Sequence, residues 1–473
     1  MPTWMPRQIS RRVLWCSVAL LGTFVQSAAA ADALIDRLNA VPGLTIVEEK
    51  STPTGGRFFV LSFQQPVNHL KPWKGTFAQR LMFYYQGDGR PMVFYSGGYG
   101  AGTQPFLGEV ARLVSGNQIV IEHRFFEPSR PTPADWDDLT IFQQASDDHR
   151  VVQALRPLFP GRWLRTGVSK GGMQATYHTR FYPQDVDGLI AYVAPNDAID
   201  RHDAYAAFLD HVGPDPQCPQ NLKALQREAL LRRDEILPML QADADLFGYT
   251  FGGVMGSADK TFEALVLDFP FAFWQVELGP GECRFIPPVG ASTQAIFDFL
   301  HVFFFFSSDE FFLDFTPYYH QAGTQLGYPT PADAHLTDLL RYPGTNVPRS
   351  FVPAEIPMRE HQWWAMLDID LYVRFAGRRQ MFIYGEYDPR GAERFQPGPN
   401  ADSYVYIQPA GGHRANIGRL PPSDRDAATN IVRRWAGLPP EALATAMIPA
   451  PPETAADRER DRIDRRLPRS FRR

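Results

Sequence analysis

The sequence predicts a doubly wound, mostly parallel α/β sheet with an inserted, mainly helical cap. Short apolar segments alternate with helical segments both before residue 198 and after residue 378. Between those positions the alternation stops and helical patterns dominate. A Gly-x-Ser-x-Gly turn at residues 167–171 also stands between an apolar segment and a helical one, where such a sheet carries a sharp turn.

The first part of the predicted core opens with two antiparallel strands at residues 58–63 and 77–85. Apolar strands are expected at 91–95 and 118–122, followed by a long amphipathic helix over 135–156, which Pro157 ends. Further strands are expected at 163–166 and 189–193, with the helix that follows the Gly-x-Ser-x-Gly turn, at 173–181, between them.

The predicted, mainly helical cap contains a helix over 222–237, with Pro238 just beyond it, and two apolar, aromatic segments over 262–273 and 293–306. Its aromatic run over 303–315 is expected to pack the interior of the cap, with an apolar substrate pocket as the alternative. The core then resumes with strands at 380–385 and 404–407 and a closing helix at 427–435. The predicted parts are therefore a signal peptide (1–30), core (31–197), cap (198–378), core (379–450) and a charged tail (451–473).

Composition excludes several classes of protein. The 473 residues are 44% hydrophobic and 21% charged, which is typical of a globular chain with a large core. A formal net charge of −5 gives no reason to expect a nucleic-acid partner. No apolar run after residue 30 is long enough to span a bilayer, so no membrane span is expected.

The N-terminus is typical of a secretory signal peptide. A basic start with Arg7, Arg11 and Arg12 precedes an apolar stretch over 13–25 and the small residues 27–30. We expect removal near Ala30 and a secreted or periplasmic protein. Residues 10–14 also resemble a twin-arginine export signal, and an ordinary basic start is the alternative.

Export leaves two cysteines in the mature chain, because Cys16 is removed with the signal peptide. Cys218 and Cys283 both fall in the predicted cap. In an oxidising compartment they are expected to form one disulfide, the alternative being two buried thiols.

Ser169 is the candidate nucleophile, because the flanking glycines let the backbone turn sharply enough to expose its hydroxyl. A serine needs a base to take its proton and a third group to orient that base. In this strand–turn–helix context the acid and then the histidine follow the serine, each after a late strand. Asp388 and His413 stand at those positions. For Asp388 the alternative is a turn-capping role before Pro389, and for His413 an ordinary surface loop.

The oxyanion of such a reaction needs at least two preset N–H donors. We expect one to be the backbone N–H of Lys170, which follows the nucleophile. The other is expected from the glycine-rich segment 97–100, with Tyr99 as the candidate.

Several longer motifs show a family resemblance. Residues 167–173, 177–183, 191–197, 122–126, 129–131, 136–140 and 384–389 resemble the secreted bacterial tripeptidyl or prolyl-specific aminopeptidases. These are serine peptidases with an α/β-hydrolase core, distantly similar to lysosomal prolyl carboxypeptidase. The resemblance covers nearly all of the mature chain and implies the triad Ser169, Asp388 and His413, with release of short peptides from free N-termini. Arg414 departs from the pattern, which has a small residue there.

An exopeptidase that acts at a free N-terminus needs a carboxylate near the nucleophile for the substrate ammonium. Glu122 ends the fourth predicted strand, and the carboxyl ends of such strands border the crevice. Glu122 is therefore the candidate, and an internal salt bridge with Arg124 or Arg165 is the alternative.

The expected function is that of an exported serine aminopeptidase acting on peptides or small proteins, without a cofactor or a metal. A secreted carboxylesterase or lipase is the alternative within enzymes, because the same triad serves both reactions. A non-catalytic binding protein with a hydrolase fold is the alternative from another class.

Overall fold

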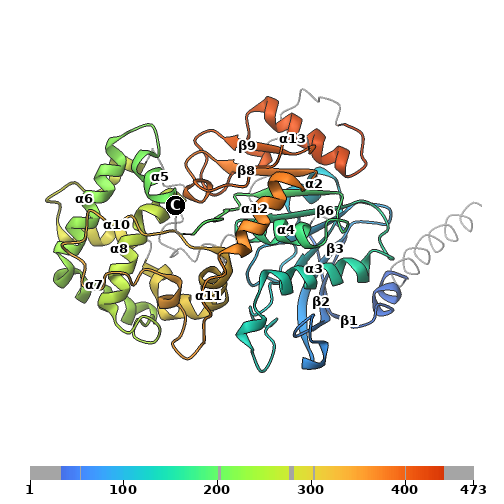
Figure 1. The fold of residues 1–473 in the computed structure, drawn as a ribbon, viewed down its shortest axis with the longest axis horizontal. Helices are drawn as coiled ribbons and strands as arrows, with labels where there is room; N and C mark the ends of the chain where they lie inside the picture. Colours follow the sequence, from blue (N-terminus) through green and yellow to red (C-terminus); the bar gives the residue numbers. More distant parts are fainter. Residues whose placement is uncertain are drawn as a thin grey trace, which may run out of the picture.

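The computed structural model describes residues 33–53, 55–200, 204–275, 282–301, 304–399 and 401–440. The predicted signal peptide and the charged tail lie outside these ranges. A sheet-based core and a helical cap lie side by side (Figure 1). None of the helices within these ranges is long and apolar enough to cross a membrane.

The core is built on one nine-stranded sheet with the order β1-β2-β3-β5-β4-β6-β7-β8-β9. The first strands pair antiparallel as far as the β3–β5 contact, and every pairing from β5 through β4 to β9 is parallel. The strand bounds are β1 Leu44–Lys50, β2 Arg57–Pro66, β3 Thr76–Tyr85, β4 Met92–Ser96, β5 Asn117–Ile121, β6 Trp163–Val168, β7 Gly188–Tyr192, β8 Gln380–Gly385 and β9 Tyr404–Gln408. This is the predicted doubly wound α/β-hydrolase architecture.

Strand β1 is absent from the sequence prediction, which placed only two strands in the opening antiparallel part. It is an edge strand whose residues are mostly exposed. Because it includes the charged residues Glu48, Glu49 and Lys50, it lacks the apolar signature of a buried strand.

Helices cover both faces of the sheet. On one face α4 (Lys170–Phe181) and α12 (Trp364–Phe375) pack against β7 and β8 in one apolar cluster, and α3 (Ile141–Leu155) lies beside α4. On the other face α2 (Glu109–Leu113) and α13 (Pro422–Trp435) pack together on the central strands. The parallel strands therefore have both faces covered, as their continuous apolar sequences require.

The cap has a hydrophobic core of its own, formed by α5 (Tyr205–His211), α6 (Gln217–Leu231), α7 (Arg233–Phe247), α8 (Ala258–Gln275) and α10 (Thr293–His301). A smaller apolar cluster forms around α11 (Asp309–Gln321). Phe312 is buried there and stacks with Phe351 at a ring-centroid distance of 5.1 Å, as expected for an aromatic residue that packs the cap. The disulfide between Cys218 and Cys283 joins α6 to the segment after α8.

Three boundaries differ from the prediction. The helix expected over 222–237 is two helices, α6 and α7, and Pro238 lies inside α7, where Ile236 and Leu240 bury their side chains in the cap core. The helix expected over 135–156 begins as a separate 3₁₀ turn, and Thr140 caps α3 by accepting a hydrogen bond from the N–H of Gln143. The cap also ends before residue 378, since α12 packs on the core sheet.

Candidate active site

The predicted nucleophile lies at the sharp turn between β6 and α4. Ser169 has φ 55° and ψ −125°, an unfavourable conformation for a residue with a side chain. The flanking glycines make this turn possible. A Cβ on Gly167 would overlap the carbonyl of Gly171, and a Cβ on Gly171 would overlap the carbonyl oxygen of Ser96 at the end of β4. The chain therefore needs glycine at both positions to present the serine.

The structure brings the predicted serine, histidine and aspartate together. Nε2 of His413 lies 2.8 Å from Oγ of Ser169, and Nδ1 of His413 lies 2.8 Å from Oδ2 of Asp388. The three residues follow β6, β8 and β9, whose carboxyl ends lie at one edge of the sheet. With the imidazole proton on Nδ1, His413 donates to Asp388 and accepts from the serine hydroxyl.

Asp388 makes contacts that fit both of the roles that the sequence left as alternatives. Its side chain is 0% exposed, and Oδ2 faces His413. Oδ1 accepts a hydrogen bond of 3.0 Å from the backbone N–H of Arg390, which caps the short turn Pro389–Gly391. The local turn therefore fixes the carboxylate that orients the histidine.

The glycine-rich segment after β4 lies directly against the serine turn. Gly98 has φ +82°, and a Cβ on it would lie 2.5 Å from the backbone nitrogen of Gly171. Both predicted oxyanion donors, the amides of Tyr99 and Lys170, belong to these two touching segments. Their role stays a prediction.

Aromatic side chains of the core and cap meet beside this segment. The ring of Tyr99 contacts Phe126 of the core and Phe315 and Tyr318 of α11, with centroid distances of 5.8, 5.4 and 5.7 Å. Tyr99, Phe315 and Tyr318 are only half-buried. Phe315 thus differs from the fully buried Phe312 and contacts a residue of the segment that lies against the serine turn.

Glu122 is buried among internal partners. Its side chain is 0% exposed and forms an ion pair with Arg80. Oε1 also accepts from the N–H of Ala101 at 2.9 Å, and Oε2 accepts from the hydroxyl of Ser129 at 2.5 Å. Both oxygens therefore face the protein instead of a substrate ammonium in this conformation.

The sequence predicted that an internal ion pair of Glu122 would be with Arg124 or Arg165. That choice of partner is wrong, because Glu122 pairs with Arg80. Those two arginines are buried and pair with the adjacent aspartates Asp147 and Asp148 of α3. Arg80 reaches Glu122 because β3, the strand that carries Arg80, lies beside β5 in the sheet.

Two contributions to the site were missed from the sequence. The Lys170 side chain is buried, and its Nζ donates a 2.7 Å hydrogen bond to the carbonyl oxygen of Gly98. Arg390 ties the loop that carries Asp388 to the cap, with its guanidinium 4.4 Å from the ring centroid of Phe271 and its Nε 3.3 Å from Oε1 of Gln275. Their positions beside Ser169 and Asp388 in the sequence were the available signal.

Among the described residues, no group of three or more His, Cys, Asp or Glu side chains is arranged to hold a metal ion. A serine, a histidine and an aspartate linked in this order above an α/β-hydrolase sheet are typical of serine hydrolases.

Comparison with known proteins shows which family of serine hydrolases the chain belongs to. The chain belongs to the PS-10 peptidase S37 family, which matches residues 27–471. It is 46% identical over 434 residues to the prolyl tri/tetrapeptidyl aminopeptidase of Streptomyces mobaraensis, covering 90% of each chain. It is also 34% identical over 189 residues to the serine protease vicPb of Bipolaris victoriae (strain FI3), covering 34% of this chain and 35% of the relative. The chain is therefore a serine peptidase, and the longer match supports an aminopeptidase.

Among solved structures, the proline iminopeptidase of Mycobacterium smegmatis is similar to this chain in fold, with a TM-score of 0.40 and 16% sequence identity. The match covers 79% of this chain and 98% of the iminopeptidase chain.

Proposed function

We propose that this protein is an exported serine aminopeptidase that releases tripeptides or tetrapeptides from free N-termini, with cleavage after proline. The observation that carries the proposal is the hydrogen-bonded series Ser169–His413–Asp388 in a chain of the S37 peptidase family. The peptide length and the preference for proline are supported by the name of the Streptomyces relative. Export is supported by the signal-like N-terminus and the disulfide.

In the proposed reaction, Oγ of Ser169 attacks the carbonyl carbon of the scissile bond while Nε2 of His413 takes the hydroxyl proton. Asp388 keeps the imidazole oriented and stabilises its charged form. The oxyanion lies between the segment 97–100 and the start of α4. His413 then gives the proton to the leaving amine, and water hydrolyses the acyl-enzyme to release the N-terminal peptide.

The test uses chromogenic peptides that end in proline or alanine before the leaving group, each with a free and with a blocked N-terminus, and matched simple esters. We expect turnover of free-amine peptides with proline, and its loss by a factor of about 10³ or more in Ser169→Ala, with unchanged thermal unfolding. A fluorophosphonate should label Ser169. Preference for simple esters, or for blocked peptides, would contradict the aminopeptidase.

A further inference from the structure

Catalysis at Ser169 depends on a segment that has little stiffness of its own. The turn after β4 contains Gly97, Gly98 and Gly100, and Gly98 has a positive φ. Glycine allows such a turn but leaves the backbone many alternative conformations. An oxyanion donor works only if its N–H is already aimed at the developing charge. Other groups must therefore hold this segment against the serine turn.

Lys170 provides one attachment. Its side chain is 1% exposed, and Nζ donates to the carbonyl oxygen of Gly98 at 2.7 Å. The ammonium lies 5.6 Å from the ring centroid of Tyr99 and 5.9 Å from that of Phe126. Because a peptide unit is planar and trans, fixing the carbonyl of Gly98 also fixes the direction of the Tyr99 N–H. Desolvation lowers the pKa of Lys170 well below its usual value, and either protonation state keeps an N–H donor.

The residues after β5 provide the other attachments. The N–H of His123 donates to the carbonyl oxygen of Tyr99 at 3.1 Å. Glu122 accepts from the N–H of Ala101, while Arg80 donates to the carbonyl oxygen of Ala101 at 2.6 Å and pairs with Glu122. The Glu122–Arg80 pair therefore holds both the N–H and the carbonyl oxygen of Ala101, at the end of this segment.

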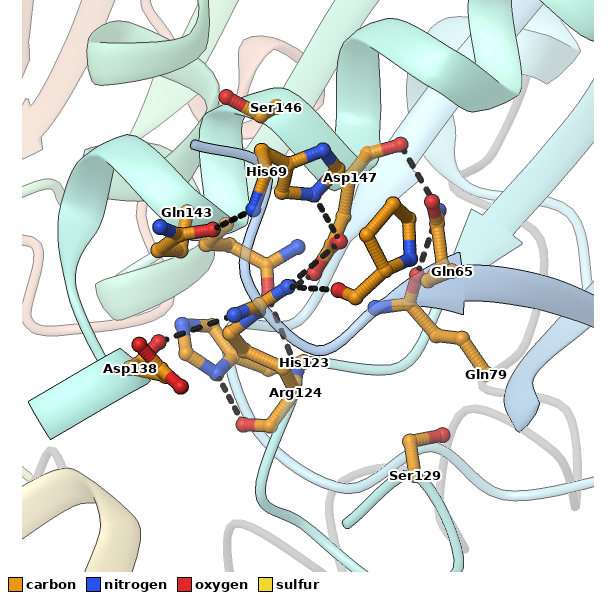
Figure 2. Close-up of polar contacts among 12 residues, drawn as sticks. Gln65, His69, Gln79, His123, Arg124, Ser129, Asp138, Gln143, Ser146 and Asp147 are labelled. Carbon is orange, nitrogen blue, oxygen red and sulfur yellow. Dashed lines mark hydrogen bonds and ion pairs between the residues drawn. The ribbon is translucent and has the colours of Figure 1, made fainter. Parts of the chain in front are cut away.

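The residues after β5 that make these contacts are themselves held by hydrogen bonds to neighbouring elements. Arg124 next to His123 donates to both carboxylate oxygens of Asp147, at 2.7 and 2.8 Å, and these residues lie together in a buried polar cluster (Figure 2). Gln79 of β3 donates to the backbone oxygen of Glu122 at 2.9 Å. The end of β5 is thus fixed to α3 and to β3.

We infer that Lys170 and Glu122 are positioning residues that hold the segment 97–101 in the conformation in which its amide stabilises the oxyanion. Lys170 acts through the carbonyl of Gly98, and Glu122 with Arg80 acts through Ala101. This function of Glu122 replaces binding of the substrate ammonium. The inference rests on the proposed hydrolysis at Ser169.

The first test replaces Lys170 by methionine, which has similar length and no donor. Oxyanion stabilisation is realised in the transition state, so Lys170→Met should lower kcat by about 10- to 100-fold and change KM less than about twofold. The affinity for a peptide boronate, which mimics the tetrahedral state, should fall by the same factor as kcat/KM. Lys223→Met is the control, because it also removes a lysine contact, the ion pair with Asp210, but in the cap. Unchanged boronate affinity in a folded variant would overturn the function of Lys170.

The second test separates the two hypotheses for Glu122. As a positioning residue, Glu122→Gln should lower kcat by a similar factor for free-amine peptides and for blocked esters. A rise in KM confined to free-amine peptides would overturn the inference and assign ammonium binding to Glu122. If either variant does not fold, Ser129→Ala, which removes the hydrogen bond to Oε2 of Glu122, is measured in the same way. Its kcat should fall several-fold on both substrate types, and unchanged kcat would count against the inference. Fluorophosphonate labelling of the parent enzyme checks the proposed hydrolysis independently.

Discussion

Phe315 of the cap lies against Tyr99 of the core, with ring centroids 5.4 Å apart at an interplanar angle of 64°. Tyr99 immediately follows Gly98, which touches the serine turn. A helix of the cap therefore contributes an aromatic side chain that contacts the segment lying against the serine turn. A proline ring is compact and apolar, so aromatic rings in this position are suited to contact it.

We expect Phe315→Ala to weaken the proposed preference for proline. Loss of one apolar contact of this kind changes the ratio of kcat/KM values by roughly 10-fold. The ratio for peptides with proline or alanine before the scissile bond should fall by that amount. Phe375→Ala is the control, because Phe375 is 81% exposed at the end of α12. An unchanged ratio would remove Phe315 from the substrate site.

Asp388→Asn tests the orientation of His413. The amide oxygen can still accept from the N–H of Arg390, so the turn should survive. The NH2 group of the introduced amide would face His413, and it can neither stabilise a charged imidazole nor favour the required tautomer. We therefore expect kcat to fall by about 10³- to 10⁴-fold. Thermal unfolding close to that of the parent should accompany this loss. Near-normal turnover would mean that another group orients the histidine.

The sequence predicts which candidate residues come together better than it predicts the contacts around them. Ser169, Asp388 and His413 were named as candidates because a strand-end position and an order along the chain are local signals, and the structure brings the three side chains together. The ion pair of Glu122 was assigned to the wrong arginine, because it depends on β3 lying beside β5. Strand order in a sheet follows from packing, and no local pattern in a single sequence specifies it.

The boundaries of the helices and of the cap were also only partly predictable from local sequence patterns. Pro238 was expected to end a helix, since proline removes a backbone donor and disturbs the preceding turn. In the structure the cost is compensated by burial of Ile236 and Leu240 on either side. The end of the cap was placed too late because the apolar face of α12 does not reveal whether it packs on helices or on the sheet.

The disulfide is expected to stabilise the cap. Cys218 and Cys283 are 65 residues apart in the sequence, and a native disulfide typically contributes about 2–4 kcal/mol to stability. Replacing both cysteines by serine should lower the urea midpoint of the cap, while reduction of the parent gives a similar shift. Peptide mapping without reductant should recover the linked pair. Two free thiols in exported protein would contradict the pairing.

Ionisation of Asp268 on α8 is expected to destabilise the folded protein as the pH rises. Desolvation raises its pKa from 3.8 to about 6, although Asn346 donates to Oδ1 at 2.7 Å and Arg390 attracts the charge. A carboxyl with a raised pKa binds its proton more tightly in the folded protein than in the unfolded one. Its contribution is therefore fully present below about pH 4 and is lost as the pH rises to about 6.

Asp268→Asn should remove this pH-dependent loss while keeping an acceptor for Asn346. Urea unfolding of parent and variant should agree near pH 4, and at pH 7 the variant should be more stable by about 1–3 kcal/mol. Asp402→Asn is the control of opposite sign. Arg434 lowers the pKa of Asp402 to about 2, so its contribution is present above about pH 4 and is lost as the pH falls. If Asp268→Asn destabilises the protein at pH 7, the ionised carboxylate and Arg390 form a net stabilising pair, and the expected sign is wrong.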